Sequence, residues 1–295
     1  MKPDVSVILP YYEGQNWVVR SIASVQQQKG VSWELIIVDD ESVFPLSEIT
    51  ERFYDEDIIT CRIKHSGKGA ALNKGIAEAH SEIVCFIDQD DIMLPGRLEK
   101  QFRVFQNDPS TNVVYSDYER VFDDGRLIDQ FISCQTSPKE CLHSIAKGIS
   151  PISMQTIMIR KGTIDEVGGF CEDPRLGGLD DLEFFVRLCI STVVMAYEPG
   201  LVQQWVRHSG NFSYSAKFDK ARLFALDRIS ELSARYPMIR KELPYFRYHA
   251  FCMRGLHRLE NRMGGKAYVE FLKAIRARPC NWNGYYLLLK SFLKL

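Results

Sequence analysis

The sequence has no long apolar run. None of its segments approaches the roughly 18 consecutive apolar residues that a membrane-spanning helix needs. Its first apolar run, Val5 to Leu9, is far shorter than the hydrophobic region of a signal peptide, and Asp4 stands where such a peptide carries basic residues. We therefore expect neither export nor a membrane span.

The chain also lacks a cysteine framework and a strong net charge. Its eight cysteines are scattered without a Cys-x-x-Cys spacing, so we expect reduced thiols in a cytoplasmic protein. Lys and Arg number 37 against 38 Asp and Glu, which argues against a protein that binds nucleic acid through its overall charge. No Gly-x-Gly-x-x-Gly follows the first apolar run, which disfavours dinucleotide binding.

What the sequence does contain is typical of a globular α/β protein. At 295 residues, with 45% hydrophobic and 25% charged residues, it can build one large domain or one domain with a smaller appendage. From Lys217 onward the pattern is helical and more basic. We place a boundary near residue 215, so that residues 216–295 form a helical C-terminal extension.

Short, wholly apolar segments alternate with helical patterns in the first part of the chain. This alternation predicts a mostly parallel central sheet flanked by helices. The expected strands are residues 5–9, 35–38, 83–87, 113–116, 156–159 and 193–197, and the expected helices are residues 16–28, 68–79, 96–107 and 182–190. We expect a loop, "WVRHSGNFSYS", after the last of these strands.

Carboxylates follow two of the expected buried strands. Asp39-Asp40 ends one of them, and "FIDQDD" places Asp88, Asp90 and Asp91 after another. Ligands of parallel sheets lie beyond the carboxyl ends of the strands, so these groups and Pro10 could meet in one crevice. An Asp-x-Asp there can supply oxygen ligands to Mg²⁺ or Mn²⁺. The alternative is that each carboxylate only forms a turn or caps a helix.

Several segments together resemble family 2 glycosyltransferases of the GT-A fold. They are "VSVILPYYEG", "LIIVDDES", "GKGAALNKGI", "EIVCFIDQDDIMLPGRL", "VVYSDY", "VGGFCED", "LDDLEFFVRL" and "WVRHSGNFS". The resemblance covers about residues 4 to 215, with the segments in the family's order. It implies a catalytic domain over residues 1–215, with a nucleotide-sugar-binding half at about 1–95 and an acceptor half at about 96–215.

The resemblance also implies a set of donor-binding residues. These are Pro10, Tyr12, Glu13, Asp39, Asp40, Lys68, Asp88 and Arg207. Tyr12 would stack on the base, Asp39 would accept a hydrogen bond from the base or ribose, and Lys68 would contact the diphosphate or base. The chain departs from the family at Glu13, where Asn is frequent, and at Leu72, where Arg is frequent.

Metal binding and catalysis are implied in the same way. Asp90 would ligate Mn²⁺ or Mg²⁺ directly, Asp88 would face the ribose or the metal, and His208 would complete the metal shell. Asp181 would be the base that takes the acceptor proton, with Asp180 beside it. The alternative for the last two is that they cap the helix that begins near Leu182.

The function that follows is sugar transfer with inversion from a nucleotide-diphosphate sugar, UDP- or dTDP-linked. The acceptor would be a hydroxyl of a growing glycan or a lipid-linked acceptor in cell-surface polysaccharide biosynthesis. A nucleotidyltransferase and a non-catalytic sugar-nucleotide-binding protein are the alternatives. Tyr285 to Leu295, with Lys290 and Lys294, suits either helix packing or peripheral contact with the inner face of the plasma membrane.

Overall fold

The computed structural model describes residues 2–44, 46–51, 53, 56–211 and 216–292. The chain forms two compact units. The first, which we call the sheet unit, comprises Met1–Pro138, Pro151–Pro174 and Ser191–Asn211. The second, the helical unit, comprises Lys139–Ser150, Arg175–Ile190 and Phe212–Leu295. The boundary that we expected near residue 215 falls outside the described residues.

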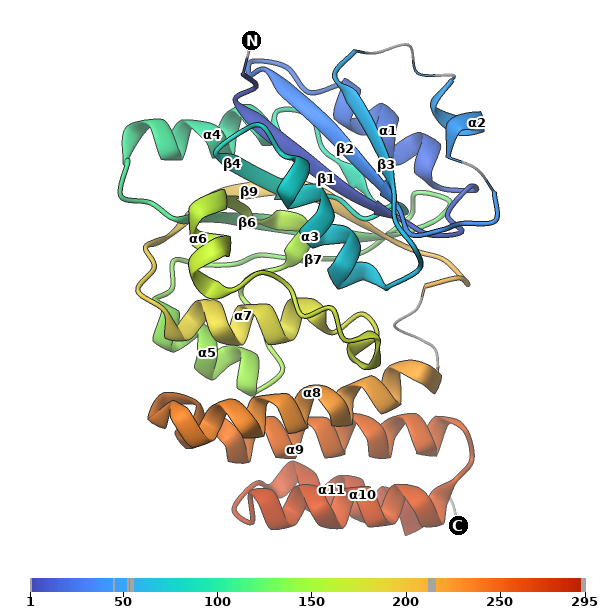
Figure 1. The fold of residues 1–295 in the computed structure, drawn as a ribbon. Helices are drawn as coiled ribbons and strands as arrows, with labels where there is room; N and C mark the ends of the chain where they lie inside the picture. The colour runs from blue at the N-terminus through green and yellow to red at the C-terminus, as the bar shows by residue number, and fades with distance from the viewer. Residues whose placement is uncertain (1, 45, 52, 54–55, 212–215, 293–295) are drawn as a thin grey trace. The chain divides into compact units, whose positions relative to one another are not determined.

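The sheet unit contains a nine-stranded sheet of order β3-β2-β1-β4-β8-β6-β9-β5, with β7 paired to β6 (Figure 1). Its strands are β1 (Val5–Tyr11), β2 (Trp33–Asp39), β3 (Ile58–Arg62), β4 (Ile83–Phe86), β5 (Ile92–Met93), β6 (Val113–Phe122), β7 (Leu127–Phe131), β8 (Met158–Arg160) and β9 (Met195–Arg207). Strands β1 to β4, β6 and β9 run in one direction, and β5, β7 and β8 run against them. The predicted mostly parallel α/β sheet is confirmed.

Helices of the sheet unit pack on both faces of this sheet. They are α1 (Val18–Gln26), α2 (Ser47–Thr50), α3 (Lys68–Glu78), α4 (Arg97–Asn107) and α6 (Lys161–Val167). The side chains of β1 alternate, so Val7 and Leu9 join the apolar core that contains α1, whereas Ile8 faces α3. A Cβ on Gly75 of α3 would lie 2.5 Å from Ile8, so the missing side chain lets the helix approach the strand closely.

The late strand is longer than the sequence predicted. We expected a strand over residues 193–197 and a loop that includes Trp205 to Arg207, but β9 continues through Arg207. It pairs with β6 along its length, and two register shifts beside Asp117, with Gly200 at φ 119°, accommodate the irregular segment at Pro199. His208 therefore follows directly on a strand end.

The helical unit is built almost entirely from helices. They are α5 (Pro138–Ala146), α7 (Asp180–Ile190), α8 (Ala216–Arg235), α9 (Pro237–Glu260), α10 (Gly264–Ala277) and α11 (Trp282–Phe292). Helix α9 packs between α8 and α10, around an apolar cluster that includes Phe271 and Leu287 (Figure 1). The predicted C-terminal helices are thus present. Of the helices described in either unit, none has both the length and the apolar character needed to cross a bilayer.

Candidate functional site

Four strands that run in the same direction end at one edge of the sheet. They are β1, β2, β4 and β9, and the segments that follow them carry most of the predicted site residues. Hydrogen bonds join these segments across long stretches of sequence. Tyr12 bonds Gln89, Glu13 bonds Ser42, and Asp90 bonds His208. The strand ends therefore form one polar cluster within the sheet unit.

Asp88 is held between an amine and an amide. Its Oδ1 lies 2.6 Å from Nζ of Lys68, the first residue of α3, and its Oδ2 accepts a 2.6 Å hydrogen bond from Nε2 of Gln155. Gln155 belongs to a short 3₁₀ helix, Met154–Thr156. Two predicted donor-binding residues, Lys68 and Asp88, are thus in direct contact, while Gln155 was not predicted.

Asp90 is bonded on one oxygen by the loop after β9. Its Oδ2 lies 2.8 Å from Nε2 of His208 and 3.1 Å from Nδ2 of Asn211. Its carboxylate is about one-fifth exposed (21%), and no described residue donates to Oδ1. Burial and the negative charge of Asp88 raise the pKa of Asp90, against the lowering effect of His208. Burial is the larger cause, and the carboxylates of Asp88 and Asp90 also repel each other.

The imidazole of His208 is fixed on three sides. Its ring stacks on the indole of Trp17 with centroids 4.0 Å apart. The backbone N–H of Gly210 donates to Nδ1 at 3.1 Å, which favours a ring proton on Nε2, the nitrogen that lies 2.8 Å from Oδ2 of Asp90 and 3.1 Å from Nδ2 of Asn211. In this tautomer His208 orients Asp90; to ligate a metal through Nε2 it would need the other tautomer and would lose the Gly210 bond.

Asp91 is fully buried and connects the loop after β4 to the sheet. Its Oδ1 accepts a hydrogen bond from the backbone N–H of Val206 in β9, and its carbonyl accepts one from Oγ of Ser21 in α1. Burial and the adjacent charges of Asp90 and Asp88 raise the pKa of Asp91 well above its usual range. Of the three carboxylates, this one lies farthest from solvent and holds the loop.

Gln89 joins the carboxylate loop to the loop after β1. Its Oε1 accepts from the backbone N–H of Tyr12 at 2.8 Å, and its Nε2 donates to the Tyr12 carbonyl at 3.0 Å. A Cβ on Gly14 would lie 2.3 Å from the Gln89 amide, so Gly14 leaves room for this pairing. The segment that carries Asp88 and Asp90 is thereby fixed to the segment that carries Tyr12.

Asp39 and Asp40, at the end of β2, are almost wholly buried. Asp39 accepts from the backbone N–H of Ser42 and from Nη1 of Arg62. Asp40 accepts from the N–H groups of Ser66 and Gly67, just before α3, and its Oδ2 lies 2.9 Å from Nδ1 of His65. A carboxylate has about four acceptor positions, so Asp39 can accept a further bond from a ligand.

Tyr12 lies at the surface beside this pair. Its ring stacks on that of His65 with centroids 4.5 Å apart, and Tyr12 is 46% exposed. Pro10 precedes it within β1. Glu13 has φ 50°, in the left-handed region that Asn adopts more readily than Glu, and its carboxylate accepts from the backbone N–H of Val43.

The remaining predicted residues lie at two separate places in the chain. Arg207 is the exposed last residue of β9, and its guanidinium lies 5.9 Å from the ring centroid of Phe122. Asp180 and Asp181 form the first turn of α7 in the helical unit, Asp180 buried and Asp181 half-buried. Oδ1 of Asp181 accepts a 2.6 Å bond from the N–H of Leu182. Acidic side chains in the first turn of a helix also interact favourably with the helix dipole.

The carboxylate oxygens of this cluster fit a hard divalent cation that receives further oxygen ligands from a substrate. Within the described ranges, no group of three or more His, Cys, Asp or Glu side chains is arranged to hold a metal ion. Asp90 nevertheless presents Oδ1 without a described donor, next to the carboxylate of Asp88. Carboxylate oxygens combined with phosphate oxygens are the coordination that Mg²⁺ prefers.

Sequence reasoning missed the residues that complete the cluster. Each of them contacts a predicted site residue, and they are Trp17, Arg62, His65, Gln89, Gln155 and Asn211. Two of them had a local signal. Gln89 lies inside "FIDQDD", and Asn211 follows His208 at the spacing of a side-chain-to-backbone turn.

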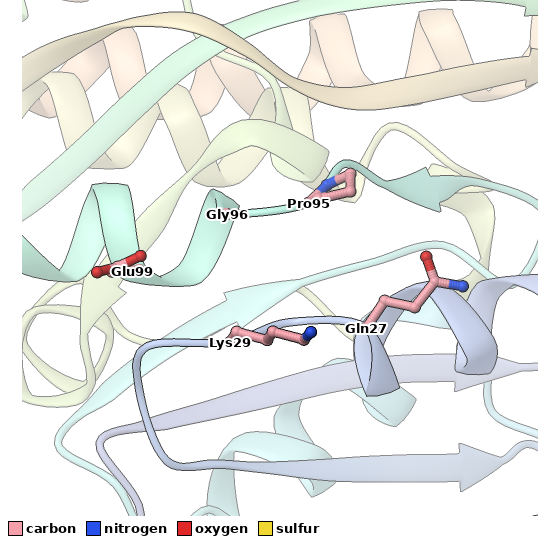
Figure 2. Close-up of a pocket in the computed structure, with 5 residues that line it drawn as sticks. All are labelled: Gln27, Lys29, Pro95, Gly96 and Glu99. Atoms are coloured by element: carbon pink, nitrogen blue, oxygen red, sulfur yellow. The ribbon is translucent and has the colours of Figure 1, made fainter.

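A separate small cavity lies away from these residues. Figure 2 shows that Gln27 and Lys29, at and after the end of α1, line it opposite Pro95, Gly96 and Glu99. None of the five is a predicted site residue, and Lys29 and Glu99 carry opposite charges. Nothing in its lining favours a nucleotide.

Comparison with known proteins gives a consistent result. The family model described as glycosyl transferase family 2 matches residues 6–167. A Bacillus subtilis protein named as a teichuronic acid biosynthesis glycosyltransferase, TuaG, is 30% identical over 190 residues, which cover 63% of this chain and 72% of that protein. An Escherichia coli protein, WfgD, is 27% identical over 132 residues, which cover 44% of this chain and 51% of that protein. It is named as a UDP-Glc:α-D-GlcNAc-diphosphoundecaprenol β-1,3-glucosyltransferase.

Solved structures share the fold. TarS 1–349 of S. aureus, in complex with UDP-GlcNAc, aligns with a TM-score of 0.64 at 18% identity, over 99% of this chain and 92% of that one. The mannosyltransferase PcManGT of Pyrobaculum calidifontis, in complex with GDP-Man and Mn²⁺, aligns with a TM-score of 0.61 at 16% identity, over 99% and 80%. The match to an uncharacterised Rickettsia bellii glycosyltransferase spans only 22% of that protein.

Proposed function

Because the chain belongs to glycosyltransferase family 2, we propose that it transfers a sugar, with inversion, from a UDP- or dTDP-linked donor to an acceptor hydroxyl. Residues 1–215 are the proposed catalytic part, with the donor held by the half at about 1–95, and residues 216–295 are the extension. The observation that carries the proposal is that Lys68 contacts Asp88, and His208 contacts Asp90, beyond the carboxyl ends of the parallel strands.

The proposed binding site for the sugar donor uses residues from several of the strand ends that form the polar cluster. Tyr12 stacks on the base, with Pro10 and Glu13 beside it, and Asp39 accepts a hydrogen bond from the base or ribose. The exposed face of Tyr12 and the unused acceptor positions of Asp39 support this. Lys68 and Arg207 supply positive charge to the diphosphate, and Asp40 holds the turn before Lys68.

Asp90 is the proposed direct ligand of Mn²⁺ or Mg²⁺, with Asp88 and His208 beside it. When bound, the ion neutralises charge on the departing diphosphate. The mutual repulsion of the Asp88 and Asp90 carboxylates supports a cation in this place. Gln155 and Lys68 orient Asp88, whereas Trp17, Gly210 and Asn211 orient His208 and Asp90.

Asp181 is the proposed base that removes the proton from the acceptor hydroxyl, and Asp180 contacts the acceptor or its loop. In an inverting displacement the hydroxyl attacks from the face opposite the departing diphosphate, so its proton must pass to a group on that side. The match of "LDDLEFFVRL" to the family's acidic pair supports the assignment.

We place this activity in cell-surface polysaccharide biosynthesis, with a growing glycan or a lipid-linked acceptor. The names of the Bacillus and Escherichia relatives support that setting. A cytoplasmic location, in contact with the inner face of the plasma membrane, belongs to the same proposal. The eight cysteines are free thiols, which suits a reducing compartment.

A donor panel tests the proposal. Nucleotide sugars are incubated with the protein, an acceptor preparation and Mn²⁺ or Mg²⁺, and nucleotide diphosphate release is measured with and without EDTA. We expect release that EDTA abolishes, and a loss of about a hundredfold or more in Asp90→Asn and in Asp181→Asn, because each removes a charged group that acts in the transition state.

Asp129→Asn is the matched control, since Asp129 is an exposed carboxylate on β7 paired with Arg120. It should keep full activity. Release of diphosphate from a nucleoside triphosphate would instead identify a nucleotidyltransferase. Thermal stabilisation by UDP and Mn²⁺ without turnover on a broad acceptor panel would identify a binding protein.

A further inference from the structure

Helix α11 is apolar on two opposite faces. Its inner face, at Gly284, Leu287 and Ser291, is buried against the rest of the helical unit. A Cβ on Gly284 would lie 3.1 Å from Ile275 of α10 and 3.3 Å from Tyr248 of α9, so the helix backbone packs closely there. The inner face accounts for the folding of α11, and the outer face needs a separate explanation.

The outer face is a stripe of large apolar side chains. Trp282, Tyr285, Tyr286 and Leu289 follow one another at i, i+3, i+4 and i+7, the spacing of one face of a helix. Their exposed fractions are 85%, 39%, 62% and 64%. We call these four residues the outer stripe. A contiguous exposed patch of this kind marks a surface that binds another protein or a membrane.

Positive charge accompanies the outer stripe. The solvent face of α10, which packs against α11, exposes Lys266, Lys273 and Arg276, with Val269 among them. Lys290 is exposed on α11 itself. Residues 216–295 hold seventeen Lys and Arg against six Asp and Glu, whereas residues 1–215 hold twenty against thirty-two.

We propose that the outer stripe and the basic surface beside it bind the surface of an anionic lipid bilayer. Trp and Tyr are amphipathic rings that settle at the level of lipid headgroups. Lys and Arg near them are attracted to anionic lipids over a Debye length of about 8–10 Å. The described part of α11, eleven residues or about 16 Å, is shorter than a bilayer-spanning helix, and we place it in the interface.

The charge distribution favours a lipid surface over a protein partner. Residues 264–292 expose Lys266, Lys273, Arg276 and Lys290, and their one carboxylate, Glu270, is buried, so this part matches a wide surface of uniform negative charge. This inference deepens the membrane contact that the proposed function includes, and it does not rest on the transfer reaction. Vesicle binding needs neither donor nor acceptor, so the two proposals fail or succeed independently.

Co-sedimentation with vesicles is the test. The full chain is mixed with vesicles of phosphatidylcholine containing about one third phosphatidylglycerol, and separately with pure phosphatidylcholine. We expect about tenfold or more tighter binding to the anionic vesicles, weakened by salt. The triple variant Trp282→Ser, Tyr286→Ser, Leu289→Ser should bind at least about tenfold more weakly. The reason is that it has less apolar surface to transfer from water into the lipid.

A matched variant controls for exposed apolar area. Leu127→Ser with Ile132→Ser changes two exposed aliphatic side chains of the sheet unit and should bind like the unchanged protein. Trp282→Phe keeps an aromatic ring and should still bind, but without the blue shift in tryptophan emission that Trp282 gives on entering the headgroup region.

Three results would overturn the proposal. The first is equal binding of the triple variant and the unchanged protein to anionic vesicles. The second is equal binding of the unchanged protein to neutral and anionic vesicles. The third is a dimer in light scattering that the triple variant disrupts, without vesicle binding, which would assign the outer stripe to a second copy of the chain.

Discussion

Gln89 stands between two acidic residues, yet its side chain pairs with a backbone. Its amide oxygen accepts from the backbone N–H of Tyr12 and its amide nitrogen donates to the Tyr12 carbonyl, as a neighbouring strand would. This pairing fixes the distance between the proposed metal ligands and the proposed base-stacking ring. Gln89 is therefore a positioning residue, because it acts on the site through Tyr12.

Replacing Gln89 tests that role. In Gln89→Ala, nucleotide diphosphate should bind up to about thirtyfold more weakly, since two hydrogen bonds of about 1 kcal/mol each no longer hold the Tyr12 loop. Calorimetry with UDP or dTDP and Mn²⁺ measures this. The control is Gln130→Ala, an exposed glutamine of β7 that bonds Glu119. Equal nucleotide affinity in both variants would show that the Tyr12 loop is held by other contacts.

At the residue scale, the local environment decided what was predictable. The carboxylates of "FIDQDD" and "VDDES" could be selected from sequence because each directly follows a buried strand. Of their partners, Lys68 and His208 could be selected only through the resemblance to the family, and Gln155 could not be selected at all. Asp88 and Gln155 are 67 positions apart, and Asp90 and His208 are 118 apart, with no local pattern that links either pair.

At the scale of elements, burial decided what was predictable. Strands β1, β2 and β4 are buried on both faces and appear in the sequence as short apolar runs. Strand β7 is mostly exposed, and β5 has two residues, so neither produces a pattern. They exist because β6 and β9 offer them a partner.

An arginine two residues after the end of helix α9 has an unfavourable backbone conformation. Arg262 has φ 57°, with its N–H bonded to the Leu259 carbonyl and the N–H of Met263 bonded to the Arg258 carbonyl. This is a Schellman ending, whose left-handed residue is usually glycine. Gly168 occupies the equivalent place after α6, with φ 96°.

Arg262→Gly should therefore stabilise the helical unit by about 0.5–1 kcal/mol, because glycine adopts positive φ without a steric penalty. Gly168→Ala should destabilise the protein by about 1–2 kcal/mol for the opposite reason. Urea unfolding followed by circular dichroism measures both. A loss of stability in Arg262→Gly would mean that the arginine side chain contributes more than its backbone conformation costs.

At the scale of the whole molecule, the near-zero net charge conceals a strong separation. The acidic excess lies in residues 1–215 and the basic excess in residues 216–295. Opposite charges cancel in the net value but not in the field near each part, because salt screens that field beyond about 8–10 Å. The near-zero net charge therefore excludes only binding through the overall charge of the chain.

This separation predicts chromatographic behaviour. Despite a formal charge of -1 at pH 7, the protein should bind a cation-exchange matrix at low salt through its basic part. Lys266→Gln, Lys273→Gln and Arg276→Gln together should elute at clearly lower salt. The matched triple Lys2→Gln, Arg103→Gln and Arg126→Gln removes three exposed charges from the sheet unit and should elute nearly unchanged. Equal shifts would show that the matrix reads net charge alone.

The sequence by itself determined the order of buried strands and helices, the carboxylates at the strand ends and the basic C-terminal part. These are properties of neighbouring residues, so they can be read without a fold. Only the tertiary structure decided which donor faces each carboxylate oxygen, the length of β9 and the exposure of the outer stripe. The physical reason is that hydrogen bonds between distant segments, and the burial of one helix face rather than another, acquire their free energy only once the sheet and the helices have assembled.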